Sequence, residues 1–141
     1  MPSYTAPVAD TLFVLHEIVG LERMTNLPGF ASATSDIAQA VLEEGGRFAS
    51  EVLFPLNAVG DQQGCKRNDD GTVSVPPGFK DAFDQFVAGG WTTLHAPEEF
   101  GGQALPMVLA IAVEEYFTGA NHAFNMYHGL TGAAVSAILA K

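Results

Sequence analysis

The feature that most constrains the fold of this chain is the shortage of charge in its C-terminal third. Between Met107 and Ala140 the only charged side chains are Glu114 and Glu115, although 16% of the 141 residues are charged. A helix that is apolar most of the way round belongs inside a larger body of protein. We therefore expect much of this third to be covered by protein outside the sequence. The alternative is a homo-oligomer that buries the same surface.

The overall composition argues against several classes of function. The net charge is −10 and the six Lys and Arg residues are scattered, whereas nucleic-acid binding needs clustered basic residues. The apolar run from Val108 to Val113 is far shorter than the roughly 20 residues that cross a bilayer, so we expect no membrane span. Cys65 is the single cysteine and cannot form an internal disulfide, and no positively charged signal segment begins the chain. We therefore expect a cytoplasmic protein.

Apolar residues recur at helical intervals along most of the chain, so the sequence predicts an all-α fold. The expected helices begin at Asp10 or Thr11, at Ser35-Asp36 with a capping side chain, and at Pro77, and two more cover about 107–117 and 124–140. In the helix that begins at Ser35-Asp36, Gly45-Gly46 lowers helix propensity, and Pro55 should kink or break the helix. A polar connector from Gly60 to Gly78 contains a turn at Asn68–Gly71 and a short strand at Thr72–Val75.

No group of residues in the sequence has the spacing of a catalytic, cofactor-binding or metal site. His122 and His128 are six residues apart, which is not the spacing that places two ligands on one helix face. Gly101-Gly102-Gln103-Ala104 has no strand before it and no Lys after it, so we interpret it as a structural turn and not as a phosphate-binding loop. Glu114 and Glu115 point about 100° apart on a helix and do not share a site. A charge in such apolar surroundings needs a partner, and we expect N–H groups, an Arg from outside the chain, or water.

Several short motifs occur in the same order as in one known family. They are Tyr4, Pro7, Asp10 and Phe13, then Ala49-x-x-Val52-x-x-Pro55-Leu56-Asn57, Gly60-Asp61-x-x-Gly64-Cys65, Pro77-Gly78-Phe79-Lys80-x-Ala82, Gly90-Trp91, Pro97-x-x-x-Gly101-Gly102-x-x-Leu105-Pro106 and Glu114-Glu115. From about Tyr4 to Leu139 the chain resembles the N-terminal helical domain of the flavin-dependent acyl-CoA dehydrogenases. It is most similar to the branch that includes 3-methylmercaptopropionyl-CoA dehydrogenase. One departure is Ala104, where the family usually has a glycine.

The resemblance implies an N-terminal arm and short helix over residues 1–34 and the family's helical domain over residues 35–141. In the family, a β-domain and a C-terminal helical domain follow, and FAD binds between those two. The reaction is the α,β-dehydrogenation of an acyl-CoA thioester in fatty acid metabolism, with hydride transfer to the flavin. We expect no catalytic and no FAD-binding residue in this chain, which should be inactive alone. The longer enzyme is expected to be a homodimer or homotetramer.

The resemblance also implies that the last two helices contribute a wall of the acyl pocket. By position, the substrate-binding residues would be Phe117, Asn121, Phe124, Tyr127, His128 and Thr131. Alternatively, the three aromatic residues among them belong simply to the core. Two other interpretations of the whole chain stay open. It can be a stand-alone helical interaction or dimerisation module without catalytic activity, or part of an acyl-CoA oxidase or flavin monooxygenase with the same fold.

Overall fold

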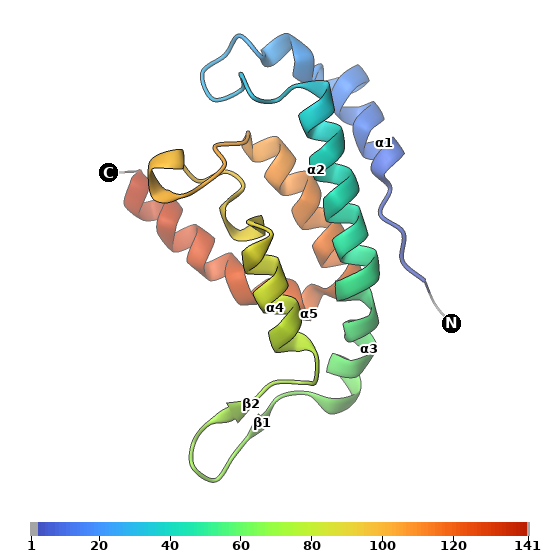
Figure 1. The fold of residues 1–141 in the computed structure, drawn as a ribbon, viewed down its shortest axis with the longest axis vertical. Helices are drawn as coiled ribbons and strands as arrows, with labels where there is room; N and C mark the ends of the chain where they lie inside the picture. The colour runs from blue at the N-terminus through green and yellow to red at the C-terminus, as the bar shows by residue number, and fades with distance from the viewer. Residues whose placement is uncertain (1–2, 141) are drawn as a thin grey trace.

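Helices build almost all of the fold, as predicted (Figure 1). The computed structural model describes residues 3–140, and residues 1–2 and 141, at the outer ends of the two expected segments, lie outside it. The elements in chain order are α1 (Val8–Phe13), α2 (Ser35–Phe48), α3 (Phe54–Gln63), β1 (Lys66–Arg67), β2 (Val73–Ser74), α4 (Phe79–Ala88) and α5 (Met107–Leu139). Short π-helical or 3₁₀ turns cover Val14–Val19, Leu21–Met24, Ala49–Leu53, Trp91–Thr93 and Glu98–Phe100.

Helices α2 and α3 form one long rod (Figure 1). The sequence predicted that Pro55 would kink or break this helix, and the structure shows no break there. Pro55 lies in the first turn of α3, and the π-helical turn Ala49–Leu53 comes directly before it. A proline removes one N–H from the helical hydrogen-bond ladder and crowds the preceding turn. A wider π-helical turn accommodates this local defect without ending the helix.

Gly45 and Gly46 allow close packing of α2 on both sides. A Cβ atom at Gly45 would lie 3.0 Å from Cγ1 of Val113 in α5. A Cβ atom at Gly46 would lie 3.0 Å from Cβ of Ala6 in the N-terminal arm. Both glycines are buried. They lower the helix propensity of α2, but they let α5 and the N-terminal arm approach it so closely that a Cβ atom at either position would require its neighbour to shift.

Helix α2 begins at Ser35 as predicted, whereas its N-cap and the starts of two other helices differ from the prediction. Helix α1 begins at Val8 and not at residue 10 or 11. The N-cap of α2 is Thr34, whose Oγ1 accepts a hydrogen bond from the N–H of Ile37 at 3.4 Å, and not Ser35. Pro77 lies before α4, whose N-cap is Gly78 with φ of 82°. Offsets of about this size are usual at helix ends, which fray and often have irregular geometry in the first turn.

The polar connector contains the predicted turn and strand, together with a second strand. Lys66 pairs with Ser74 and Arg67 with Val73 in an antiparallel ladder. Gly71 has a φ of 85°, a left-handed conformation that glycine adopts without strain. Figure 1 shows this hairpin projecting from the end of the helical body.

Helix α5 contains a break where the sequence predicted the gap between two helices. Asn121 has φ of −157° and ψ of 86°, and it divides α5 into residues 107–120 and 122–139. Its Oδ1 accepts a hydrogen bond from the N–H of Phe124 at 3.0 Å, which caps the second half as an N-cap asparagine does. Its Nδ2 donates to the carbonyl of Leu53 at 3.1 Å, which ties the break to the α2–α3 rod.

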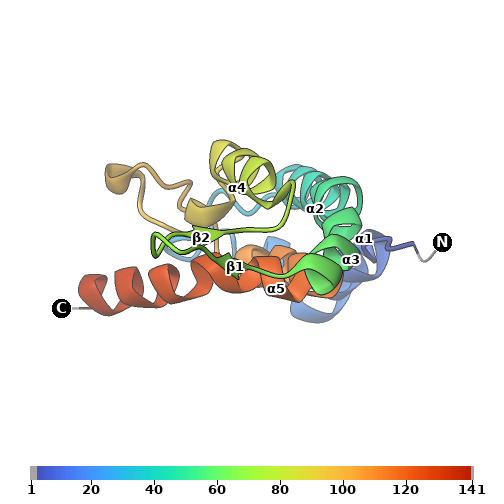
Figure 2. The same ribbon diagram turned by 90° about the horizontal axis from the view of Figure 1, so that it is seen from below.

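The core lies where the first half of α5 meets α2 and α4. Its centre is a cluster of aromatic rings with centroids 5.4–6.3 Å apart, formed by Phe48, Phe86, Trp91, Phe117 and Phe124. Seen from below, the second half of α5 extends past the edge of the α2–α4 layer towards the C-terminus (Figure 2). This overhanging half positions the candidate site.

Candidate functional site

A groove with a cavity volume of about 530 Å³ lies between the two halves of α5 and the turn that follows α4. Its lining is mostly apolar, and Glu114 is the one acidic side chain in it. The apolar lining residues include Phe83, Trp91, Leu94, Phe100, Met107, Ile111, Phe117, Tyr127 and Val135. A concave, largely apolar site with a few polar groups is the usual form of a small-molecule binding site. We refer to this site as the groove.

The structure brings four of the six predicted substrate-binding residues into the groove. Phe117, Tyr127, His128 and Thr131 all line it, while Asn121 and Phe124 do not. Asn121 is 1% exposed, and its amide bonds to backbone groups at the break in α5. The side chain of Phe124 is fully buried against the rings of α4. Their assignment to the pocket stays a prediction, and their observed contacts are structural.

Tyr127 lies at one end of the groove with 44% of its surface exposed. Its ring packs against Phe79 and Phe124 with centroids 6.2 and 5.8 Å away. Partial burial, followed by the neighbouring Cys65, raises the pKa of the Tyr127 hydroxyl above its ordinary value. The hydroxyl is therefore neutral at physiological pH.

The turn after α4 forms the opposite wall of the groove and is closed by its own hydrogen bonds. The N–H groups of Gln103, Ala104 and Leu105 donate to the carbonyls of Thr93, Ala96 and Leu94 at 3.1, 2.9 and 2.8 Å. A Cβ atom at Gly102 would overlap the carbonyl oxygen of Ala96, so the chain passes there too closely for any side chain. These amides are satisfied within the turn, which agrees with a structural turn and not with a phosphate-binding loop.

Ala104 has a φ of 48°, the single non-glycine residue with positive φ among residues 3–140. L-residues other than glycine, Asn and Asp rarely adopt this left-handed conformation. A glycine would adopt this positive φ without strain, which explains why a glycine suits this position better than the alanine of this sequence. The turn holds the strained residue with the Ala104 N–H bond to Ala96.

Sequence reasoning missed the polar residue that organises the groove wall, Asn125. It is 5% exposed and lies one turn after the break in α5. Its Nδ2 donates to Oε1 of Glu114 at 2.7 Å and to Oγ1 of Thr118 at 2.8 Å, and its Oδ1 lies 2.9 Å from Nε2 of His128. We call these four residues the polar cluster. The available signal was a lone Asn in an apolar helix, three residues before His128.

The polar cluster also supplies the partner that Glu114 was predicted to need. The predicted candidates were N–H groups, an external Arg or water, and the observed donor is a side-chain amide. His128 Nε2 lies 3.6 Å from the second carboxylate oxygen, Oε2. Glu115, by contrast, is exposed to solvent.

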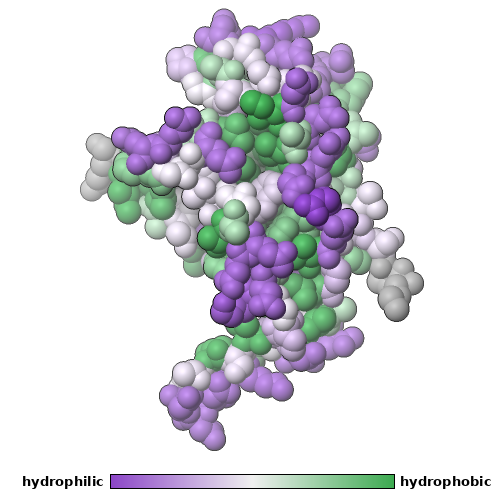
Figure 3. Space-filling model, in the orientation of Figure 1, coloured by the Kyte–Doolittle hydropathy of each residue, from purple (hydrophilic) through white to green (hydrophobic). Residues whose placement is uncertain are grey.

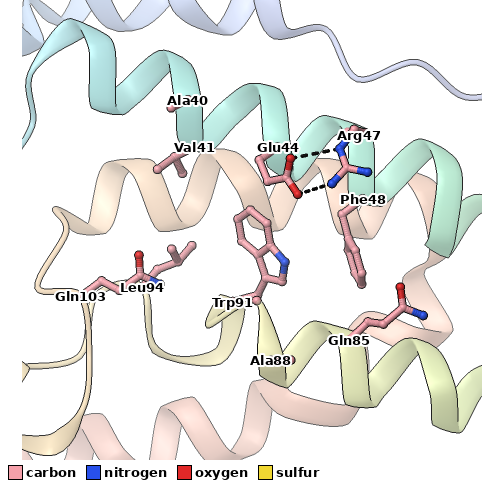
Figure 4. A pocket seen from close by; sticks show the side chains of 11 residues that line it. Ala40, Val41, Glu44, Arg47, Phe48, Gln85, Ala88, Trp91, Leu94 and Gln103 are labelled. Atoms are coloured by element: carbon pink, nitrogen blue, oxygen red, sulfur yellow. Dashed lines mark hydrogen bonds and ion pairs between the residues drawn. The ribbon is translucent and has the colours of Figure 1, made fainter.

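A second hollow of about 670 Å³ opens between α2 and α4 and contains none of the six predicted residues (Figure 4). Trp91 stands between its walls, and Arg47 on its rim bonds to Glu44 through both Nε, at 3.0 Å, and Nη2. The bond from Arg47 lowers the pKa of Glu44, and the same bond raises the pKa of Arg47. The rim charges are thus paired with each other, which leaves the hollow without a free charge to bind a ligand.

Within residues 3–140, no three His, Cys, Asp or Glu side chains gather closely enough to hold a metal ion. In the same described part of the chain, no helix combines the length and the apolar character needed to cross a membrane. On the face shown in Figure 3, apolar surface is visible at the end of α5, next to the C-terminus. In the second half of α5, Leu130 is 84% exposed and Ile138 is 73% exposed.

Comparison with known proteins finds homologous acyl-CoA dehydrogenases. No protein-family model matches the chain. Over 136 residues, however, it is 38% identical to 3-methylmercaptopropionyl-CoA dehydrogenase of Ruegeria pomeroyi. It is also 28% identical over 138 residues to a broad-specificity linear acyl-CoA dehydrogenase of Mycobacterium tuberculosis. The chain is homologous to acyl-CoA dehydrogenases.

These matches confirm the family and the branch that the motifs indicated. They cover 96% and 95% of this chain but only 23% and 22% of the two acyl-CoA dehydrogenases. The chain thus spans less than a quarter of the length of the relatives it matches. Because the first match covers 96% of this chain, it includes most of the residues that line the groove.

Proposed function

We propose that this chain is the N-terminal helical portion of a FAD-dependent acyl-CoA dehydrogenase, in which it contributes packing surface and part of the acyl pocket. The observation that carries the proposal is the apolar groove, built by the segment that matches acyl-CoA dehydrogenases over nearly its whole length. Its volume of about 530 Å³ is within the usual range for small-molecule sites, about 300–1,000 Å³.

In this proposal the residues of the chain bind and enclose the acyl chain. Phe117 forms an apolar surface at the base, while Tyr127, His128 and Thr131 line the wall on the second half of α5. Enclosing the acyl chain excludes water and fixes the position of the thioester at its end, which favours reaction by orientation. Asn121 would act indirectly, because it sets the direction in which this wall leaves the break.

The described residues do not fit FAD, the cofactor that would accept the hydride in the full enzyme. One common binding site for a dinucleotide pyrophosphate is a set of free N–H groups at a glycine-rich helix start. In the turn at Gly101-Gly102, the N–H groups of Gly102, Gln103, Ala104 and Leu105 already donate to carbonyls of the same turn. FAD would therefore be held by other parts of the enzyme, and no catalytic residue is assigned to this chain.

The exposed apolar face of α5 suits the proposed partners, which are the β-domain and C-terminal helical domain of the enzyme. Met126, Leu130 and Ile138 are 65%, 84% and 73% exposed, although such residues usually lie inside. These three residues lie outside the lining of the groove, so they would serve as docking surface for the other domains and not as part of the acyl pocket. The enzyme would act in the cytoplasm on fatty acyl thioesters as a homodimer or homotetramer.

A second candidate function is a stand-alone helical module that pairs through this same face. The exposed apolar residues of α5 support it, because a contiguous apolar patch marks an interaction site. The homology to acyl-CoA dehydrogenases favours the enzyme over the module.

A hybrid enzyme tests the proposal. The matching segment of the Ruegeria pomeroyi dehydrogenase is replaced by this chain, and the product is assayed for bound flavin and for acyl-CoA-dependent reduction of a dye. We expect both to be retained. As a control, the same segment is replaced by an unrelated helical domain of equal length, which should abolish both. A hybrid that folds but has neither flavin nor activity would refute the proposal and favour the module.

A further inference from the structure

We propose that Asn125 determines which acyl chains the groove accepts, by holding Glu114 and His128 in a closed hydrogen-bonded cluster in which the carboxylate that faces an apolar chain is paired. The inference rests on the proposed function, since it names the substrate selectivity of the same groove. It concerns a residue that contributes indirectly: Asn125 is buried behind the wall, whereas Glu114 and His128 line the groove.

The cluster joins the two halves of α5 across the break. Glu114 and Thr118 belong to the first half, and Asn125 and His128 to the second. The bonds from Asn125 Nδ2 to Glu114 and Thr118, at 2.7 and 2.8 Å, therefore fix one half of the helix against the other. Because these halves form two sides of the groove, the cluster also fixes the width of the groove at this point.

The chemistry of the donors and acceptors determines the orientation of every group. An ionised carboxylate only accepts hydrogen bonds, so the amide NH₂ of Asn125 must face Glu114. Its carbonyl oxygen then faces His128, 2.9 Å from Nε2, and an amide oxygen also only accepts. Nε2 of His128 must therefore carry a proton, and the neutral ring has its bare nitrogen at Nδ1.

The ring of His128 is held from a second side by an aromatic contact. Its centroid lies 4.8 Å from that of Phe86, and its side chain is 16% exposed. The hydrogen bond to Asn125 and the contact with Phe86 together leave the imidazole one orientation. A fixed ring contributes a constant shape to the groove wall.

Glu114 determines the electrostatic character of the groove, because it is the one acidic side chain in the lining. An unpaired carboxylate in an apolar groove disfavours the burial of an apolar chain beside it, since the chain displaces the water that solvates the charge. Asn125 supplies a fixed donor to one oxygen of this carboxylate, whose side chain is 45% exposed, and His128 Nε2 lies 3.6 Å from the other oxygen. The wall then accepts an apolar chain and still repels an anionic chain end.

The first experiment measures the tautomer of His128 in the chain itself. Histidine ¹⁵N NMR spectra are recorded at a pH at which imidazoles are neutral, and the His128 signals are assigned by their loss in His128→Gln. We expect a protonated Nε2 and a bare Nδ1 for His128 in the unmodified chain. A protonated Nδ1, or rapid exchange between the tautomers, would overturn the closed cluster whatever the function of the chain.

The second experiment uses the hybrid enzyme with octanoyl-CoA as the probe. In Asn125→Leu we expect KM to rise about tenfold, the loss of one hydrogen bond to a charged group, with kcat changed less than about twofold. Asn57→Leu makes the same replacement at an exposed helical position and should leave both constants unchanged. The double variant Glu114→Leu with Asn125→Leu should recover most of the KM, because it removes the unpaired charge together with its donor.

The outcomes separate the two proposals. If the unmodified hybrid has no flavin and no activity, the proposed function fails and this inference fails with it. If the unmodified hybrid is active and Asn125→Leu leaves KM unchanged, only the inference on selectivity fails. A KM that stays raised in the double variant would also overturn it, because the effect of Asn125 would then not pass through Glu114.

Discussion

The two halves of α5 are similar in composition and differ in their surroundings. In residues 107–120, Leu109, Val113, Tyr116 and Phe117 are at most 2% exposed. In residues 122–139, Phe124 and Asn125 are buried just after the break, and the rest of the half is largely exposed. The difference shows that apolar character alone does not place a helix in the core. The first half packs on α2, whereas α4 contacts the second half only close to the break, at Phe124, Tyr127 and His128. Beyond these residues the second half extends past the edge of the α2–α4 layer (Figure 2).

The largest test of this comparison replaces one large apolar side chain in each half. Phe117→Ala removes a ring from the aromatic cluster and should lower the free energy of unfolding by about 3–5 kcal/mol. Leu130→Ala should change it by less than about 0.5 kcal/mol, because this side chain is 84% exposed. Urea unfolding followed by circular dichroism measures both. Similar losses in the two variants would mean that the second half is packed in solution, for example in an oligomer.

The next test removes the residue that separates the halves. Asn121→Ala loses both the cap on the N–H of Phe124 and the buried bond to the Leu53 carbonyl. We expect a loss of about 2 kcal/mol in the free energy of unfolding. The adjacent exposed residue provides the control, and His122→Ala should be nearly neutral. Equal effects at the two positions would contradict the capping role of Asn121.

Two glycines give opposite expectations for the same substitution. Gly45→Ala, where α2 packs on the first half of α5, would place Cβ 3.0 Å from Val113 and should cost about 1 kcal/mol. Gly132→Ala, in the second half, meets no atom within 4 Å and should stabilise the helix by about 0.5–1 kcal/mol. Thermal unfolding of the pair measures the difference. A gain of stability in Gly45→Ala would show that α2 and α5 can separate at little cost.

The smallest test uses pH and a tyrosine in each half. Burial raises the pKa of Tyr116 in the folded protein, so its phenol stays neutral to higher pH than in the unfolded chain. This contribution to stability is complete below the unfolded pKa of about 10 and is lost as the pH rises through the folded value. Tyr116→Phe should therefore weaken the alkaline loss of Tm, and Tyr127→Phe, which replaces a tyrosine that is 44% exposed, should do so less. A larger effect at Tyr127 would reverse the comparison.

Much of the fold could be predicted from the sequence because local signals were strong. The order of the helices, the turn at Asn68–Gly71 and the interruption between residues 117 and 124 follow from periodicity, glycine and polar residues. The continuity of the α2–α3 rod through Pro55 could not be predicted. It depends on a π-helical turn, and a single sequence carries no clear signal for one.

The residues of the candidate site could be predicted only in part. Positions on the second half of α5 were identified from the resemblance, and Tyr127, His128 and Thr131 do line the groove. Of the two asparagines, the sequence singled out Asn121 and not Asn125. Only the structure shows that the Asn121 amide bonds to the backbone, whereas the Asn125 amide bonds to Glu114 in the groove wall. The opposite wall came from a turn with no helical period, so its residues could not be assigned a direction.

The break at Asn121 has a consequence for how the protein opens. A helix interrupted by one non-helical residue contains two cooperative units, and the unit with few buried contacts opens first. Amide protons of residues 126–139 should then exchange with solvent without global unfolding. Those of residues 109–117 should exchange only when the whole core unfolds. A partner that covers the exposed half would slow exchange there and leave the core rates unchanged. Binding of a partner to the second half of α5 would thus be detected as slower amide exchange in residues 126–139, with unchanged exchange in residues 109–117.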